Sequence, residues 1–481
     1  MADLNRYKKR KAKIICTLGP ATSSEEMISQ LVQAGADVFR LNFSHGIHKE
    51  HAESIRRIRR ISGKTGKPTA IIQDLQGPKI RIGRLEEETY RLRRNASFVI
   101  KKRSMTGTGS TVSTDYPALC DKVYRNDQIL INDGQINLRV LKVQDGDIYC
   151  RVIEGGILQE HKGVNVPGRE LGLKSLTPKD RDDLSFGLKQ GVDFVAISMV
   201  RTARDIILVK RLIKKHGSNT PVIAKLEQVM AIEHLDDIMA AADGVMVARG
   251  DLGVEIPLER VPLLQKEIIR KANQAHIPVI TATQMLESMI EQARPTRAEV
   301  SDVANAVFDG TDAVMLSAET ASGKHPVKAV HMMRRTILAA EERPPDHFVP
   351  LNGEQLSLPE AVSNTACHLA SKMDVKAIVT STLSGNSALR LSKYRPRVPV
   401  LAFTPDPEVE RRMSLLWGVI PRRMSMLKAM DDIFDKLVYE IKGGKLAKRG
   451  DLLVMVSQSP RPGRKHRVGA PTDLIKVHQV E

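Results

Sequence analysis

Residues 242–257, ADGVMVARGDLGVEIP, are the stretch that decides the fold. The short apolar run 245–248 lies between turn-forming residues and among helical patterns, which predicts a buried parallel strand. It ends abruptly in Arg249, Gly250 and Asp251, and packing alone gives no reason for charges there. In barrels and open α/β sheets, the carboxyl ends of parallel strands form the rim where active sites are built. The alternative is a strand that stops in a solvated loop.

Apolar strands of this kind alternate with amphipathic helical patterns through much of the chain. The expected strands lie at 13–17, 37–42, 69–74, 193–198, 221–225, 243–248, 278–283 and 312–316. The expected helices lie at 24–34, 48–63, 178–190, 203–216, 228–241, 261–276, 296–308 and 326–341. This alternation predicts a parallel (β/α)8 barrel, a TIM barrel, formed by residues 1–78 and 163–343.

Residues 79–162 interrupt the barrel with short β-like runs of a different character. Asp133-Gly134, Asp145-Gly146 and Gly155-Gly156 separate these runs. Asp-Gly between alternating runs is a strong hairpin signal, so a small antiparallel β-barrel is expected here. Because it is inserted after the third strand, this domain would stand over the rim in the position of a lid.

A third region begins after Arg343-Pro344-Pro345 and spans residues 346–481. Its expected helices are 359–372, 386–393, 407–416 and 427–442, and its expected strands are 376–381, 398–403, 419–423, 451–457 and 473–478. This pattern predicts a separate open α/β domain.

Bulk composition limits the class of protein. A chain of 481 residues is expected to form two or three domains, and 42% hydrophobic with 27% charged residues is ordinary for a globular protein. No apolar stretch approaches the roughly 20 residues that span a bilayer, so no membrane partner is expected. Cys16, Cys120, Cys150 and Cys367 lie far apart with no CxxC pair, which favours a reducing cytoplasm over disulfides or structural zinc.

The formal net charge of +18 has two explanations. A basic surface is the electrostatic footprint of nucleic-acid binding, but it also suits a protein that handles small anions. Aromatic residues are only 4% and no stacking platform is visible, so we favour small anions and expect no nucleic-acid partner. The basic clusters are Arg6, Lys8, Lys9, Arg10, Lys11 and Lys13 near one end and Arg461, Arg464, Lys465 and Arg467 near the other.

Polar and charged residues follow most of the expected barrel strands. They are Arg40, Asn42, Ser44, His45, Asp74, Lys225, Glu227, Arg249, Asp251, Thr283, Gln284, Ser317 and Glu319. Cations, carboxylates and hydroxyls on one rim are the mixture that phosphoryl transfer needs, because the cations neutralise phosphate oxygens and the carboxylates hold a divalent metal.

Two of these carboxylates come from neighbouring strands. Glu227 follows the fifth strand and Asp251 the sixth, so both could reach one Mg²⁺, an ion that takes few protein oxygens. Lys225 stands two residues before Glu227, so both side chains share one side of an extended chain. The alternatives are a solvated lysine and carboxylates that serve as helix caps or ion-pair partners.

Nine segments, taken together and in order, resemble the pyruvate kinase family, of the bacterial kind. They are KIICTLGP, RLNFSHG, DLQGPKIR, NVPG, AKLE, MVARGDLGVEIP, TATQMLESM, PTRAEVSDVANAVFDGTDAVMLSAET and TLSGNSAL. The resemblance runs through all three regions. It implies Mg²⁺-dependent transfer of a phosphoryl group from phosphoenolpyruvate to ADP, giving pyruvate and ATP in glycolysis. It also implies a cytoplasmic homotetramer that can use Mn²⁺ and is regulated by a phosphorylated metabolite.

The resemblance also implies roles for single residues. Lys225 would stabilise the transition state, Arg40 would bind the substrate phosphate, and Thr283 and Ser317 are the candidates for protonating the enolate. The other implied groups are the substrate site Gly250, Asp251 and Thr283, the Mg²⁺ ligands Glu227 and Asp251, and the nucleotide site Asn42, Ser44, His45, Arg81 and Lys162.

Many family members bind K⁺ through residues that match Asn42, Ser44, Asp74 and the carbonyl of Leu75. Those that need it carry glutamate where this chain has Lys79. The lysine ammonium is a point charge that could take the place of the ion, so K⁺ is not expected to be required. The alternative is that Lys79 points to solvent at the hinge of the lid.

The segment 380–387, TSTLSGNS, follows an expected strand and opens a helix. Hydroxyls and N–H groups at a helix N-terminus can bind phosphate, but a plain capped turn has the same residues. The resemblance favours a site for a sugar phosphate or nucleoside monophosphate, formed by Thr380, Thr382, Ser384, Asn386 and Ser387. A lyase or aldolase acting on pyruvate is the competing enzyme class, but it needs no lid over a nucleotide.

Overall fold

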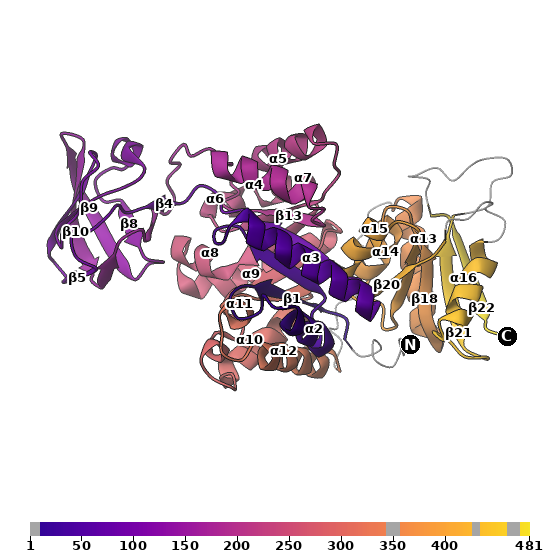
Figure 1. Cartoon of the computed structure of the whole chain (residues 1–481). Helices are drawn as coiled ribbons and strands as arrows, with labels where there is room; N and C mark the ends of the chain where they lie inside the picture. Colours follow the sequence, from indigo (N-terminus) through magenta and orange to yellow (C-terminus); the bar gives the residue numbers. More distant parts are fainter. Residues whose placement is uncertain (1–9, 343–355, 426–432, 459–471) are drawn as a thin grey trace.

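Three structural units follow one another in space (Figure 1). The computed structural model describes residues 10–342, 356–425, 433–458 and 472–481. A closed barrel lies in the middle of the view, the inserted domain on the left and the C-terminal domain on the right. The predicted break at 343–345, the start of the predicted helix 427–442 and the basic residues below 10 and at 461–467 lie outside the described residues.

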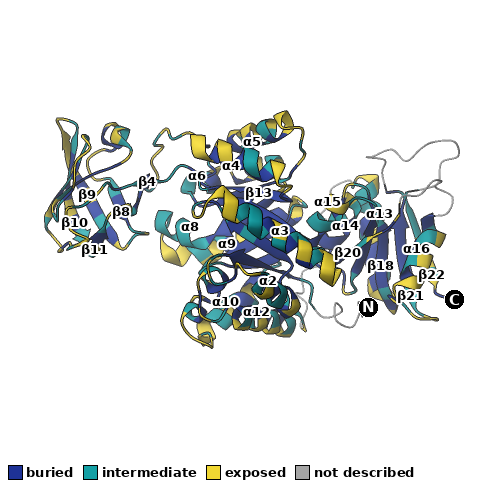
Figure 2. Cartoon of the chain, viewed as in Figure 1, coloured by how far each residue is buried: buried dark blue, intermediate teal, exposed yellow. Residues whose placement is uncertain are grey.

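The barrel has eight parallel strands in the closed order β1-β17-β16-β15-β14-β13-β3-β2, and all eight expected strands are confirmed. Their residues are mostly buried, as the dark blue centre of Figure 2 shows. The strands are β1 (Lys13–Leu18), β2 (Val38–Asn42), β3 (Ala70–Asp74), β13 (Phe194–Ile197), β14 (Val222–Leu226), β15 (Gly244–Ala248), β16 (Val279–Ala282) and β17 (Ala313–Leu316).

Helices surround the barrel close to the predicted positions. The helix expected at 228–241 is divided at His234, and the segment that begins at Arg249 is helical directly after β15. The helices are α2 (Glu25–Ala34), α3 (His48–Thr65), α4 (Pro178–Lys189), α5 (Ala203–Lys215), α6 (Val229–Glu233), α7 (Leu235–Ala241), α8 (Arg249–Glu255), α9 (Val261–Gln274), α10 (Arg297–Phe308), α11 (Ala318–Ala321) and α12 (Pro326–Glu341).

The inserted domain is a curled, mostly antiparallel sheet in the order β4-β12-β8-β9-β10-β6-β7. Its edge strands meet through a bridge between Ile82 and Thr114, and β12 extends the sheet beyond residue 162. Asp145 and Gly146, both at positive φ, form the predicted hairpin turn. The strands of this sheet are β4 (Ile80–Arg81), β6 (Ser97–Lys101), β7 (Thr111–Ser113), β8 (Gln128–Ile131), β9 (Ile136–Gln144), β10 (Asp147–Glu154) and β12 (Gly163–Asn165). β5 (Thr89–Arg91) and β11 (Ile157–Gln159) pair separately as a two-stranded sheet.

The C-terminal domain is an open sheet in the order β20-β19-β18-β21-β22, with only β22 antiparallel to its neighbour. The predicted helix 407–416 ends as an α-helix at Arg412. The elements are α13 (Leu358–Lys372), β18 (Val375–Ser381), α14 (Asn386–Lys393), β19 (Val400–Thr404), α15 (Pro407–Arg412), β20 (Val419–Arg423), α16 (Ile433–Gly443), β21 (Leu452–Ser457) and β22 (Leu474–Gln479).

Four aspartates at the amino-terminal end of the barrel connect neighbouring strands. They directly precede β2, β13, β15 and β17. Each accepts a hydrogen bond from a backbone N–H of the neighbouring strand. The pairs are Asp37 with Ile14 at 2.9 Å, Asp193 with Ile71 at 2.7 Å, Asp243 with Val222 at 2.8 Å and Asp312 with Val279 at 2.8 Å. These carboxylates therefore fasten the strands in pairs.

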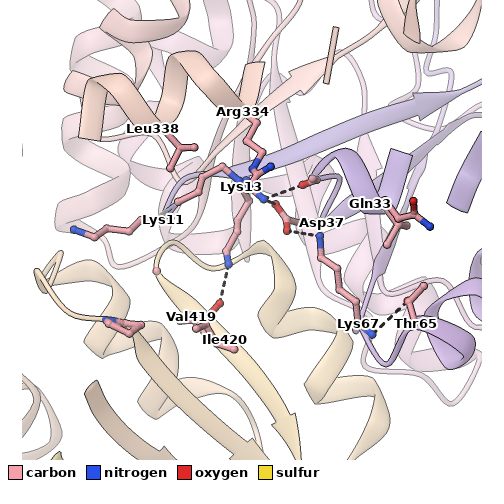
Figure 3. Close-up of a pocket in the computed structure, with 15 residues that line it drawn as sticks. Lys11, Lys13, Gln33, Asp37, Thr65, Lys67, Arg334, Leu338, Val419 and Ile420 are labelled. Carbon is pink, nitrogen blue, oxygen red and sulfur yellow. Dashed lines mark hydrogen bonds and ion pairs between the residues drawn. The ribbon is translucent and has the colours of Figure 1, made fainter. Parts of the chain in front are cut away.

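The C-terminal domain packs against this end of the barrel. Arg411 Nε donates to Asp193 Oδ1 at 2.7 Å. Lys13 Nζ donates to the Val419 carbonyl at 2.7 Å, as Figure 3 shows. A cavity of about 400 Å³ lies at this junction beside Lys13 and Asp37. Since the predicted active-site residues follow the strands, they belong to the opposite end.

Candidate active site

The ammonium of Lys225 is the centre of an ion cluster at the carboxyl ends of the strands. Its Nζ lies 2.8 Å from Glu227 Oε1 and 3.3 Å from Asp74 Oδ1. The same nitrogen donates to Ser198 Oγ at 2.7 Å. The side chain of Lys225 is only 11% exposed, so these charges interact more strongly than they would in water.

Arg40 joins this cluster through Asp74. Its Nε donates to Asp74 Oδ2 at 2.6 Å, and its Nη1 donates to Thr17 Oγ1 at 3.2 Å. Burial opposes ionisation of Asp74, but Lys225 and Arg40 outweigh it and hold the pKa of that carboxyl below its ordinary value. Burial also opposes the Lys225 ammonium, but Asp74 and Glu227 raise its pKa above the ordinary value. The ammonium of Lys225 is thus kept charged in a site with little solvent.

The two expected Mg²⁺ ligands, Glu227 and Asp251, differ in burial. Glu227 is buried, and its Oε2 accepts the Met199 N–H at 2.7 Å. Burial raises the pKa of Glu227, Lys225 opposes this rise, and the charge of Asp251 adds to it. Asp251 lies in the first turn of α8 with its side chain 32% exposed, so it has room for further ligands.

The donor set agrees with magnesium. The described part of the chain holds no group of three or more His, Cys, Asp or Glu that could bind a metal ion. Glu227 and Asp251 offer oxygen only, and Mg²⁺ prefers oxygen, keeps several waters and takes further oxygens from substrate phosphates. Two carboxylates without His or Cys therefore fit this ion.

Gly250 and Thr283 meet where β15 and β16 end. The Gly250 N–H donates to Thr283 Oγ1 at 2.8 Å, and this hydroxyl donates to the Ala282 carbonyl at 2.6 Å. The N–H of Gly250, a residue that the resemblance assigns to the substrate site, is therefore bonded to Thr283 in the structure. Arg249 also differs from expectation, because its guanidinium bonds to the chain around Thr283 and not to the Lys225 cluster.

Ser317 follows β17 and keeps an unused hydroxyl. Its N–H donates to Glu319 Oε2 at 2.7 Å, and the Leu286 N–H donates to Oε1 of the same glutamate at 3.1 Å. The Oγ of Ser317 is buried and makes no hydrogen bond to any described residue. Buried polar atoms are nearly always paired, so this hydroxyl is available to a water or a substrate.

Lys79 connects the inserted domain to the barrel. Its Nζ lies 3.8 Å from Asp251 Oδ1 and 3.6 Å from Asp133 Oδ1, and its side chain is 24% exposed. Asn165 adds a second connection, since its Nδ2 donates to Glu255 Oε1 at 3.2 Å. Lys79 therefore faces Asp251 and does not simply extend into solvent.

The expected nucleotide residues lie in two places. Asn42 and Ser44 lie at the end of β2, where Asn42 Oδ1 accepts the Ser44 N–H at 3.1 Å, and the next residue, His45, is exposed. Arg81 lies on β4 and Lys162 directly precedes the adjoining strand β12 of the inserted domain, where the Ile82 N–H donates to the Lys162 carbonyl at 3.0 Å. The Leu75 carbonyl accepts a hydrogen bond from Ser198 Oγ at 2.8 Å.

The expected effector segment spans the end of β18, a short loop and the first residues of α14. Thr382 Oγ1 accepts the Gly385 N–H at 2.9 Å, and Gly385 has a φ of 87°, which glycine adopts without strain. Ser387 Oγ lies 2.8 Å from Thr472 Oγ1. The remaining expected residues are Thr380, whose hydroxyl bonds to the Ser381 carbonyl, and Ser384 and Asn386, which bond to each other.

Two residues of the cluster were not predicted from the sequence. Ser198 contacts Lys225, and Thr17 contacts Arg40. Both stand at the ends of expected barrel strands, the fourth and the first. That position is the signal that could have identified them, but single hydroxyls there are common.

Comparisons with known proteins agree with this fold. The family model for the pyruvate kinase barrel domain matches residues 9–330, and that for the pyruvate kinase alpha/beta domain matches residues 360–478. Pyruvate kinase from Geobacillus stearothermophilus is 44% identical over 480 residues, covering 98% of this chain and 81% of the relative. Pyruvate kinase from Mycobacterium tuberculosis strain CDC 1551 is 43% identical over 98% of both chains.

A solved pyruvate kinase structure has the same fold. The crystal structure of a pyruvate kinase from Cryptosporidium parvum superimposes with a TM-score of 0.91 at 35% identity, covering 100% of this chain and 98% of that one. The fold and cluster define a metal-assisted phosphotransferase built on a barrel. The chain belongs to the pyruvate kinase family. It is a glycolytic kinase that transfers a phosphoryl group from phosphoenolpyruvate to ADP with Mg²⁺.

Proposed function

We propose that this transfer takes place at the ion cluster around Lys225. The observation that carries the proposal is a buried ammonium 2.8 Å from Glu227 and 3.3 Å from Asp74, with Arg40 on the far oxygen of Asp74. Preorganised cations in a site with little water stabilise charge that develops during reaction. Arg40 would bind the substrate phosphate, and Lys225 would stabilise the phosphoryl group in transfer and the enolate oxygen.

The chemistry has two balanced steps. An oxygen of the ADP β-phosphate forms a bond to phosphorus while the bond to the enol oxygen of phosphoenolpyruvate breaks, leaving pyruvate enolate and ATP. The enolate carbon then takes a proton from water held by Thr283 and Ser317, whose free hydroxyl supports this role. Glu227 and Asp251 would hold Mg²⁺ or Mn²⁺, which when bound neutralises phosphate oxygens. The substrate carboxylate would bind beside Gly250, Asp251 and Thr283.

The nucleotide would lie between the barrel and the inserted domain. Asn42, Ser44 and His45 face it from the barrel, while Arg81 and Lys162 would cover its phosphates when the inserted domain closes as a lid. The contact of Lys79 with both Asp133 and Asp251 supports a lid that meets the metal end of the site. The same ammonium would replace K⁺ at the site formed by Asn42, Ser44, Asp74 and Leu75.

Regulation would act through the loop 380–387, with a sugar phosphate or nucleoside monophosphate as effector. Its hydroxyls and the N-terminal amides of α14 support phosphate binding. The test is Ser384→Glu, which should repel the phosphate and remove activation with basal activity retained. If no such effector alters the substrate saturation curve of the unchanged enzyme, the proposal is wrong.

The enzyme is further proposed to work as a cytoplasmic homotetramer. None of its described helices is long and apolar enough to cross a membrane. All four cysteines are free and buried, as suits a reducing compartment. Mass measurement in solution tests the tetramer. The reaction itself is tested by following pyruvate and ATP from phosphoenolpyruvate and ADP with Mg²⁺, with Mn²⁺ and with no divalent ion.

A further inference from the structure

Thr283 and Gln284 form a backbone turn that side chains rarely adopt. They follow β16 with φ angles of 66° and 53°, so two consecutive non-glycine residues are left-handed. This conformation is strained for any residue other than glycine, and it persists only where surrounding contacts hold it. Thr283 carries the hydroxyl proposed to act on the substrate, so whatever holds this turn also sets the position of that hydroxyl.

Arg249 is the side chain that holds the turn. Its Nη2 donates to the Thr283 carbonyl at 2.7 Å and to the Gln284 carbonyl at 3.3 Å, and its Nε donates to the Ala282 carbonyl at 3.3 Å. One guanidinium thus bonds to three consecutive carbonyls. Its planar fork suits this arrangement, and the compact ammonium of lysine does not.

The guanidinium is itself fixed from the other side. Nη1 donates to Asp302 Oδ1 at 2.7 Å and to Gln265 Oε1 at 3.3 Å, and Arg249 is only 9% exposed. Asp302 lies on α10 and Gln265 on α9, so two helices of the barrel wall set the position of Arg249. Its next residue, Gly250, donates its N–H to Thr283 Oγ1 at 2.8 Å.

We propose that Arg249 is a positioning residue that acts through Thr283, fixing the Thr283 hydroxyl for protonation of the enolate. The proposal rests on the proposed function of Thr283. It requires no contact between Arg249 and substrate, and it explains a charge at the end of β15 that faces away from the Lys225 cluster. Without the guanidinium the strained turn relaxes and the hydroxyl moves, and displacements near 1 Å can cost about a hundredfold in rate.

The experiment is a double-mutant cycle with Arg249→Met and Thr283→Val. Turnover of phosphoenolpyruvate and exchange of the methyl protons of pyruvate for deuterium, with Mg²⁺ and ATP present, are both measured. Each single variant should lower both rates about 10- to 100-fold, with the KM for ADP within about twofold. The double variant should be no slower than the slower single variant, because both changes remove one function.

Controls separate this proposal from the function on which it rests. Asp302→Asn removes the charge beside Arg249 but keeps a side-chain oxygen that can accept from its Nη1, so the guanidinium should stay bonded to the turn and turnover should stay within about threefold. If Arg249→Met does not fold, Arg249→Lys takes its place in the same double-mutant cycle. Multiplicative losses in the double variant would overturn the role of Arg249 and leave that of Thr283 intact. Near-normal exchange in Thr283→Val would overturn both.

Discussion

Two buried lysines at opposite ends of the barrel have opposite pKa shifts. At the carboxyl end, Asp74 and Glu227 raise the pKa of Lys225 despite burial. At the amino-terminal end, burial lowers the pKa of Lys393 to about 8, although Asp312 attracts its proton. The difference lies in the charges nearby. Lys225 faces two carboxylates, whereas Lys393 shares one carboxylate with Arg395.

The two ends of the barrel also differ in whether their buried polar atoms have hydrogen-bond partners. Asp312 accepts from Lys393, Arg395 and the Val279 N–H, so both its oxygens are occupied. At the other end, Ser317 Oγ is buried without a hydrogen-bond partner among the described residues, and Asp74 Oδ1 has the Lys225 ion pair at 3.3 Å but no hydrogen bond of good geometry to a described residue. A buried ion pair is therefore not by itself a sign of chemistry. A buried polar atom that lacks a hydrogen-bond partner at the same end of the barrel is the better sign.

The largest effect on stability is expected from Asp312→Asn. The change leaves Lys393 and Arg395 buried without a countercharge, and removal of one partner of a buried pair typically costs about 3–5 kcal/mol. Urea denaturation should show that loss, while turnover per folded molecule stays within about twofold because the site lies at the other end. An equal drop in turnover of the folded protein would contradict the separation of the two ends.

The lowered pKa of Lys393 predicts how stability depends on pH. Between about 8 and the ordinary value of 10.5, the unfolded chain binds more protons at this lysine than the folded one. Stability from this group is therefore present at high pH and lost as pH falls through 8. Compared with Lys393→Met, the unchanged protein should gain on the order of 1–3 kcal/mol across this window. If the free energy of unfolding of the two proteins changed equally with pH, the lowered pKa of Lys393 would be disproved.

A smaller effect is expected at Lys79, on the carboxyl end. In tetramethylammonium buffer, added K⁺ should change turnover of the unchanged enzyme by less than about tenfold, or 1.4 kcal/mol in the barrier. Lys79→Glu should create a K⁺ requirement of at least that size, because it removes the ammonium that is proposed to replace the ion. Lys122→Glu, at an exposed lysine of the same domain, is the control. Strong K⁺ activation of the unchanged enzyme would show that Lys79 does not replace the ion.

Much of the fold could be predicted from the sequence because buried parallel strands are short apolar runs. All eight barrel strands and the Asp145-Gly146 hairpin were found in this way. The division of the 228–241 helix at His234 and the extension of the inserted sheet through β12 were not. Both depend on contacts between distant segments, which periodicity does not report.

The site was predictable as a set of residues but not as a geometry. Strand ends indicated Lys225, Glu227 and Asp74, which the structure brings together. The same rule placed Arg249 on the rim, although its guanidinium bonds to a backbone turn. Position along a strand says which end a residue occupies, but the direction of a long side chain is set by neighbours far away in sequence.

Turnover of Lys225→Met, measured beside Lys393→Met, is the most direct test of the account. One change removes a buried lysine at the carboxyl end of the barrel, and the other removes a buried lysine of the C-terminal domain that pairs with Asp312 at the opposite end. Lys225→Met should lower turnover by at least about 10²–10³, because it removes the charge that stabilises the transferring phosphoryl group, while phosphoenolpyruvate still binds. Lys393→Met should keep turnover within about twofold. Near-normal turnover of Lys225→Met, or an equal loss in both variants, would contradict the central claim.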